Sequence, residues 1–115
     1  MSRDPVLFLE DILEAIGQIH EFVEGMDQQA FISDQKTIHA CMNCFQIVGE
    51  AVKKLPEEWK QRESSIPWPQ IQGFRNALVH EYFHIDERIM WTTIQEDLAP
   101  LLEACKRIQD KIEKS

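Results

Sequence analysis

The sequence predicts an all-α protein, an antiparallel bundle of four main helices with one additional short helix. Apolar residues recur at steps of three and four along most of the chain, which is the period of an amphipathic helix. No segment alternates convincingly between apolar and polar residues at a period of two, the pattern of a half-buried strand. The four glycines and five prolines fall mostly where helices are expected to end.

The first two long helices have clear boundary signals. Asp4 is a favourable N-cap with Pro5 in the first turn, and a second helix is expected to begin near Ser33 or Asp34 and to end at Leu55, before Pro56. The apolar stripe of the first helix consists of Leu9, Ile12, Leu13, Ile16, Ile19, Val23 and Met26. That of the second consists of Ile38, Cys41, Phe45, Val48, Val52 and Leu55.

The second half of the chain is expected to contain the short helix and two further long ones. The segment PEEWKQRESS predicts a turn of helix followed by a loop, and Pro69 is expected to open the third long helix, which runs through Val79 and toward Phe83. Asp86 should cap the last helix, which Pro100 should kink. The inner side of that helix consists of Ile94, Leu98, Leu101, Leu102, Cys105, Ile108 and Ile112.

Length and composition indicate one domain, residues 1–115, in a cytoplasmic protein. Of the 115 residues, 43% are hydrophobic, which is enough for a compact core. No apolar run reaches the ~18 residues of a membrane span, and we identify no signal peptide, so no membrane partner is expected. Three cysteines are an odd number and exclude a complete disulfide framework.

Charge is distributed unevenly. The net charge of −8 argues against a protein that coats nucleic acid non-specifically, and no DNA partner is expected. Residues 1–52 contain nine acidic and two basic residues, whereas residues 53–88 contain six of each. Contacts with phosphate are therefore expected in the second of these regions.

The stretch RNALVHEYFHID, residues 75–86, mixes hydrogen-bonding side chains with core-type residues. On a helical wheel one side holds Ile71, Phe74, Ala77 and Leu78, and the other half holds Arg75, Asn76, His80 and Tyr82. Val79 and Phe83 lie between the polar residues, which is unusual for a face in solvent. We expect that this face is covered by a second copy of the chain, so that two sets of arginine and histidine meet across a two-fold interface.

Arginine and histidine together suit chemistry on a phosphodiester. The guanidinium group of Arg75 matches phosphate oxygens, and His80 has a side-chain type that titrates near neutral pH and transfers protons. RNA supplies its own nucleophile, the 2′-hydroxyl, so cleavage requires a proton acceptor, a proton donor and a cation. The same residues also fit a hydrogen-bonded interface network with no catalytic role.

Several other signals favour structural roles. His39, Cys41 and Cys44 suggest zinc, but both cysteines fall in the helical stripe and no further ligands complete a site, so buried thiols and no metal are expected. His84 could be a second proton carrier but fits the surface near a helix end better. The tryptophans Trp59, Trp68 and Trp91 fit core or interface positions better than base stacking. Glu50 has no assigned role.

The motif region resembles the signature of HepT-like proteins, a branch of the HEPN superfamily of RNases. The matching residues are Arg75, Asn76, His80 and Tyr82 in FRNALVHEYFHID. The segments NCFQIVGEAVKKLPEEW, IPWPQIQGFRN and IDERIMWTTIQEDLAPLL are also similar to family segments, so the resemblance covers roughly residues 5–108 in order. Where the family often has a basic residue, this chain has Met42, so RNA contacts are expected from Lys53, Lys54, Lys60 and Arg62.

The resemblance implies a toxin RNase of a toxin–antitoxin pair that forms a homodimer or higher oligomer through the motif helix. Cleavage would need no metal or cofactor and would leave a 2′,3′-cyclic phosphate and a 5′-hydroxyl. Arg75 would hold the scissile phosphate, His80 would transfer the proton, and Asn76 would orient either of them. The partner would be an MntA-type minimal nucleotidyltransferase that attaches AMP to Tyr82, adding charge and bulk near Arg75.

Two other functions remain compatible with the sequence. One is a non-enzymatic HEPN subunit that binds nucleotide or substrate for a nucleotidyltransferase, and the other is a structural helical adaptor. A paired arginine and histidine favour the RNase, because a binding subunit would not need a titrating histidine.

Overall fold

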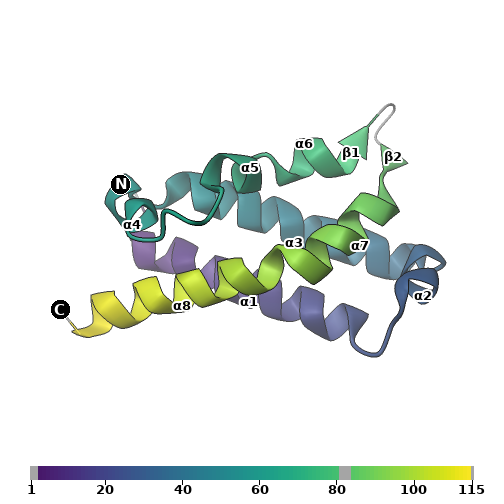
Figure 1. Ribbon diagram of the computed structural model, residues 1–115, viewed down its shortest axis with the longest axis horizontal. Helices are drawn as coiled ribbons and strands as arrows, with labels where there is room; N and C mark the ends of the chain where they lie inside the picture. Colours follow the sequence, from purple (N-terminus) through teal and green to yellow (C-terminus); the bar gives the residue numbers. More distant parts are fainter. Residues whose placement is uncertain (1–2, 81–83, 115) are drawn as a thin grey trace.

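A computed structural model describes residues 3–80 and 84–114 and confirms the all-α fold class (Figure 1). The first half of the chain forms α1 (Pro5–Val23), α2 (Gln28–Ile32), α3 (Gln35–Lys54) and α4 (Glu57–Gln61). The second half forms α5 (Trp68–Gln72), α6 (Phe74–Leu78), β1 (Val79–His80), β2 (His84–Ile85), α7 (Glu87–Glu96) and α8 (Leu98–Lys114). Within the described residues, none of the helices has the length and apolar character of a transmembrane span.

Aspartate side chains fix the starts of the long helices, as the sequence predicts. The carboxylate of Asp4 accepts a hydrogen bond from the backbone N–H of Val6, and Asp34 accepts one from Thr37. Asp86 caps α7 in the same way. Each of these bonds satisfies a backbone donor that the helix itself leaves without a partner.

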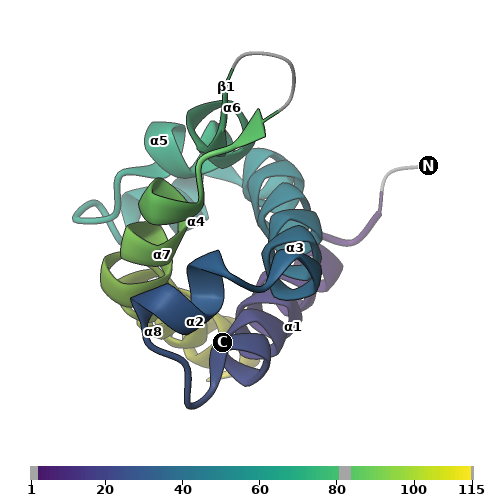
Figure 2. The ribbon, with the colours of Figure 1, turned by 90° about the vertical axis from the view of Figure 1, so that its right-hand side faces the viewer.

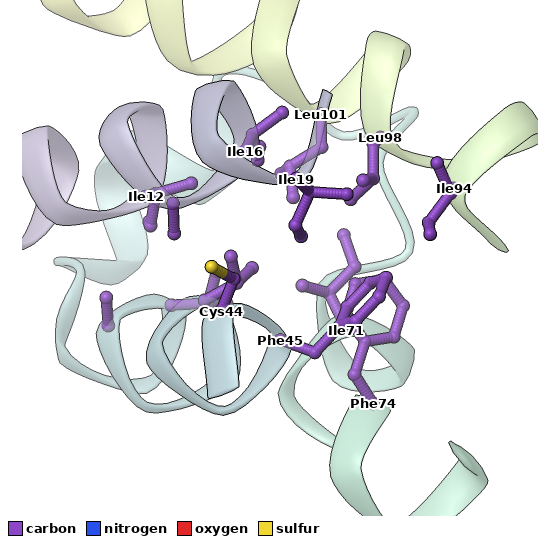
Figure 3. Packing of buried hydrophobic residues seen from close by; sticks show 14 of the residues in the cluster. Ile12, Ile16, Ile19, Cys44, Phe45, Ile71, Phe74, Ile94, Leu98 and Leu101 are labelled. Carbon is purple, nitrogen blue, oxygen red and sulfur yellow. The ribbon is translucent and has the colours of Figure 1, made fainter. Parts of the chain in front are cut away.

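The core lies between α1 and α3 on one side and the chain from α5 to α8 on the other (Figures 1 and 2). The apolar stripes of the sequence meet there, and Figure 3 shows isoleucines of α1 facing α3 and α8. Phe45 of α3 packs against Phe74 of α6 in an edge-to-face arrangement, with ring centroids 5.3 Å apart. This contact joins the motif region to the centre of the bundle.

The third long helix is the main point at which the sequence prediction is wrong. Two five-residue helices, α5 and α6, stand in its place and are separated at Gly73. Glycine weakens a helix, and the chain becomes extended at the β-branched Val79, with φ −117° and ψ 124°. The carbonyl of Leu78 then accepts from the N–H of Asp86 at 2.7 Å instead of continuing the helix. Phe83, toward which the helix was expected to extend, lies outside the described residues.

A short antiparallel strand pair replaces the expected end of that helix. Val79 pairs with Ile85 and His80 pairs with His84. The sequence gives no sign of this pair because two residues are too few to show alternation. In Figure 1 it lies at one corner of the molecule, away from the end where the chain begins and finishes.

The last long helix is also interrupted, near the predicted kink. α7 ends at Glu96 and α8 begins at Leu98, with Asp97 between them. Pro100 lacks the N–H that a continuous helix would bond to the carbonyl of Glu96, so the helix is interrupted at one residue, Asp97, close to the predicted kink.

The segment before α5 is fixed by Trp68. Its indole N–H donates to the carbonyls of Lys60 and Glu63, at 3.0 and 3.1 Å, and its ring is buried. Trp59 and Trp91 are partly buried against the core. The three tryptophans therefore occupy packing positions, as predicted.

Candidate functional site

Arg75 is presented to solvent by a helix that is anchored on both sides of it. Phe74 and Leu78, four residues apart on α6, are buried with 7% and 1% exposure. Between them Arg75, Asn76 and Ala77 are exposed. The prediction placed Ala77 on the core face and is wrong there, because a five-residue helix buries only the side that Phe74 and Leu78 share.

Gly49 allows α3 to approach the element that precedes Arg75. A Cβ atom at this position would lie 3.2 Å from the backbone oxygen of Gln72 and 3.6 Å from that of Ile71. Gly49 is buried, and Gln72 is the last residue of α5. The absence of a side chain at this point of the GEA segment therefore sets the distance between α3 and the chain that leads into α6.

A pocket of about 260 Å³ lies beside Arg75. Its lining residues are Phe45, Gln46, Gly49 and Glu50 of α3, Gln72 of α5 and Arg75 of α6. Phe45 and Gly49 are buried, whereas Gln46, Glu50 and Arg75 are exposed. Among the described residues no carboxylate is within ion-pair distance of the Arg75 guanidinium. The guanidinium is therefore available to an anion.

His80 does not continue the helical face of Arg75 and Asn76, which corrects the prediction. Its backbone lies in β1, opposite His84 in β2, where directly paired residues are neighbours across the strands. Asp86 closes this pair by donating its N–H to Leu78 and also caps α7. The predicted set is therefore divided between α6 and the strand pair, which are contiguous in the chain. Tyr82 lies outside the described residues.

Of the four cations predicted to contact RNA, three are exposed. Lys53 and Lys54 lie in the last turn of α3, and Arg62 follows α4. The Lys60 side chain is 5% exposed, with its Nζ 3.3 Å from the carbonyl of Val52 and 3.1 Å from Glu57. Lys60 therefore ties α4 to the end of α3, and its buried ammonium is not placed to contact RNA.

Lys54 and Arg62 border two different hollows. Lys54 lines a pocket of about 400 Å³ that shares Gln46 and Glu50 with the pocket beside Arg75. Arg62 lines a shallow groove between α4 and the end of α8, together with Trp59, Asp110, Lys111, Ile112 and Lys114. The two lysines of this groove are not predicted from the sequence, because nothing in the sequence brings α8 next to α4.

The two cysteines of the Cys-x-x-Cys segment are buried, as predicted. Cys41, Cys44 and Cys105 are buried free thiols. Burial raises the pKa of Cys41 to about 12, so its thiol is protonated at neutral pH. His39, on the same helix, is exposed and faces away from the two cysteines. Met42 is buried in the core, so this position does not face a ligand.

A family model described as "Ribonuclease HepT-like" matches residues 12–108. The chain belongs to the HepT-like ribonuclease family. A protein of Thermococcus cleftensis named "Probable ribonuclease HepT" is 39% identical over 101 residues, which are 88% of this chain and 92% of the relative. A Caldanaerobacter subterraneus protein named "Putative RNase TTE0752" is 37% identical over 109 residues, or 95% and 97% of the two chains. No solved structure matches the chain significantly.

For this HepT-like chain, sequence reasoning found Arg75 but missed the residues around it. Gln46 and Glu50 are exposed residues four apart on α3, and Gln72 is at the end of α5. The only available signal was Gly49, since a glycine inside a long helix suggests a close approach. Which element approaches it follows only from the fold.

Proposed function

We propose that this HepT-like protein is a metal-independent endoribonuclease and the toxin of a toxin–antitoxin pair. The observation that supports the proposal most is Arg75, an exposed guanidinium with no ion-pair partner among the described residues, on a helix anchored in the core. A free, rigidly mounted guanidinium is suited to the phosphate of an RNA linkage.

The chemistry assigns one role to each motif residue. Arg75 stabilises the negative charge on the phosphate while the ribose 2′-hydroxyl attacks phosphorus. His80 transfers the proton of the attacking or the leaving oxygen. Asn76 orients the phosphate or His80. The 2′-oxygen forms a bond to phosphorus as the bond to the 5′-oxygen breaks, so the products are a 2′,3′-cyclic phosphate and a 5′-hydroxyl.

The activity assay uses labelled RNA incubated with the purified protein in EDTA. We expect wild type to cleave, and Arg75→Ala and His80→Ala to lose roughly 10²–10⁴-fold in rate. Lys36→Ala and His39→Ala are control substitutions, because both residues are exposed on α3 and lie outside the motif. Mass spectrometry must first show that Tyr82 is unmodified. No cleavage by such a wild-type sample, or equal cleavage by His80→Ala, contradicts the proposal.

The proposal includes a dimer in which two copies of the motif face each other. Ile89 lies in the first turn of α7, close in sequence to β2, and its apolar side chain is 47% exposed. In this proposal it extends the dimer contact surface that the exposed residues of α6 begin. An Ile89→Glu substitution is expected to shift the protein toward monomer in light scattering and to lower cleavage. A monomeric wild-type protein that cleaves RNA would show that the second copy is unnecessary.

The antitoxin in this proposal is an MntA-type nucleotidyltransferase that attaches AMP to Tyr82. The added phosphate would compete with RNA for Arg75. Co-expression with a nucleotidyltransferase encoded beside this gene should add mass in multiples of AMP to the peptide that contains Tyr82. A Tyr82→Phe protein that still gains this mass excludes the assignment.

A further inference from the structure

We propose that the pocket beside Arg75 binds the base on the 5′ side of the cleaved linkage, and that Glu50 makes guanine the preferred base there. The inference rests on the proposed function, because it takes Arg75 as the group that holds the phosphate. It assigns a role to Glu50, which the sequence left without one.

The residues that line the pocket suit a planar polar group. Two of them are buried, Phe45 and Gly49, and Gly49 contributes no side chain. The walls of the pocket are Gln46 and Glu50 from α3, Gln72 from α5 and Arg75 from α6. Four hydrogen-bonding side chains from three helices thus surround a hollow of about 260 Å³, which is large enough to admit a single unstacked base.

The position of Arg75 in the wall connects this pocket to the reaction. A nucleotide's base is joined to its 3′-phosphate through a single ribose. When Arg75 binds that phosphate, the base is held next to the guanidinium, and the pocket is the hollow that Arg75 itself lines. Of the two bases that are each joined to this phosphate through one ribose, we assign the pocket to that of the nucleotide whose 2′-hydroxyl attacks.

The side chains around the pocket distinguish between bases. An ionised carboxylate only accepts hydrogen bonds, and the amide groups of Gln46 and Gln72 both donate and accept. Guanine presents two adjacent donors on its Watson–Crick edge, N1–H and the N2 amino group, which match the two oxygens of Glu50. Uracil presents one donor between two carbonyl oxygens, and a carboxylate repels both. Adenine and cytosine, with one amino group each, are intermediate.

The carboxylate of Glu50 is free to change partners. Among the described residues its ion-pair partner is Lys53 at 3.7 Å, one helical turn away, and the Glu50 and Lys53 side chains are 72% and 55% exposed. An exposed pair of this kind is weak, so a base can displace it at little cost.

The first test measures binding and does not require cleavage. Wild type, Glu50→Gln and Glu14→Gln are titrated with 3′-GMP and 3′-UMP by calorimetry or by NMR of the glutamine side-chain amides. Glu14 is an exposed residue of α1 away from the pocket, and its substitution changes the net charge equally. We expect wild type and Glu14→Gln to bind 3′-GMP about tenfold more tightly than 3′-UMP, and the ratio to approach one in Glu50→Gln.

The second test separates base selection from a role of Glu50 in orienting Arg75. Cleavage of GpA and UpA is compared in the same three proteins. Loss of base selection changes the ratio of the two rates, whereas loss of orientation lowers both rates by the same factor. Equal binding of the two nucleotides by wild type, or an unchanged preference in Glu50→Gln, overturns the proposal. Guanine selectivity in a protein that cleaves no RNA would instead contradict only the proposed function.

Discussion

Alanine substitutions at two glycines test whether the approach of α3 to α5 constrains the site. Gly17 and Gly49 both lie inside long helices, α1 and α3. A Cβ atom at Gly17 would have no atom within 4 Å, whereas at Gly49 it would lie 3.2 Å from the backbone oxygen of Gln72. The same chemical change is therefore made once in open space and once against a carbonyl.

The expected magnitudes follow from these two environments. Alanine is favoured over glycine in a helix interior by about 1 kcal/mol, so Gly17→Ala should raise the free energy of unfolding by about 0.5–1 kcal/mol. Gly49→Ala should gain the same helix stabilisation. However, the Gln72 carbonyl belongs to the backbone and must shift by a few tenths of an ångström to make room for the Cβ atom. Overpacking costs about 1–3 kcal/mol, so this variant should be destabilised by about 0–2 kcal/mol.

Thermal unfolding followed by circular dichroism measures this difference. About 1 kcal/mol corresponds to roughly 4 °C for a domain of this size, so the two variants should melt several degrees apart. Because only Gly73 separates Gln72 from α6, Gly49→Ala should also cleave RNA more slowly, and Gly17→Ala should cleave normally. If Gly49→Ala is as stable as Gly17→Ala and cleaves at the wild-type rate, the contact does not position Arg75.

Three further predictions concern the strand pair, the cations and the buried thiols. Asp86→Ala and Asp27→Ala remove the N-caps of α7 and α2, and each should lower the free energy of unfolding in urea by about 1 kcal/mol. Only Asp86→Ala should also impair cleavage. Lys54→Ala should weaken RNA binding in fluorescence anisotropy without loss of stability, whereas Lys60→Ala should lower the melting temperature and leave the RNA affinity of the folded protein unchanged. Burial raises the pKa of Cys105 from its ordinary 9.0 to about 12, so its contribution to stability is complete below pH 9 and is lost as pH rises toward 12. Cys105→Ala should therefore lose less stability than wild type between pH 9 and 11, and an equal loss would contradict this account.

The sequence was sufficient to predict the elements that are long and strongly amphipathic. In α1 and α3 the buried residues recur at helical spacing and the N-caps are aspartates, so local and tertiary preferences agree. The region from Trp68 to Ile85 was predicted less well because its order depends on distant contacts. The edge-to-face contact of Phe74 with Phe45 and the bond between Asp86 and Leu78 are not visible in any local pattern.

The same distinction applies to the candidate site. Arg75 was found because a charged residue between buried neighbours is visible in the sequence. The other residues of its pocket were not predicted. Gln46 and Glu50 line the same pocket as Arg75 only because α3 packs closely against α5, which Gly49 permits. Helical periodicity also gave the wrong relation between Asn76 and His80, because the helix ends at Leu78.

The division of the motif between a helix and a strand pair bears on the proposed mechanism. Arg75 is mounted on α6, whose two ends are buried, so its position depends on the packed core. The backbone of His80 is held by pairing with His84 and by the Asp86–Leu78 bond. A two-residue pair is much less stable than a packed helix, so it is the part of the motif that can move without unfolding the bundle. In the proposed mechanism the phosphate-binding group is therefore fixed in advance, whereas the histidine backbone can be shifted by binding of RNA, of a second copy or of an antitoxin to the strand pair. In this proposal, a modification of Tyr82, two residues after His80 in the sequence, would act on the group that transfers the proton as well as on the cation that binds the phosphate.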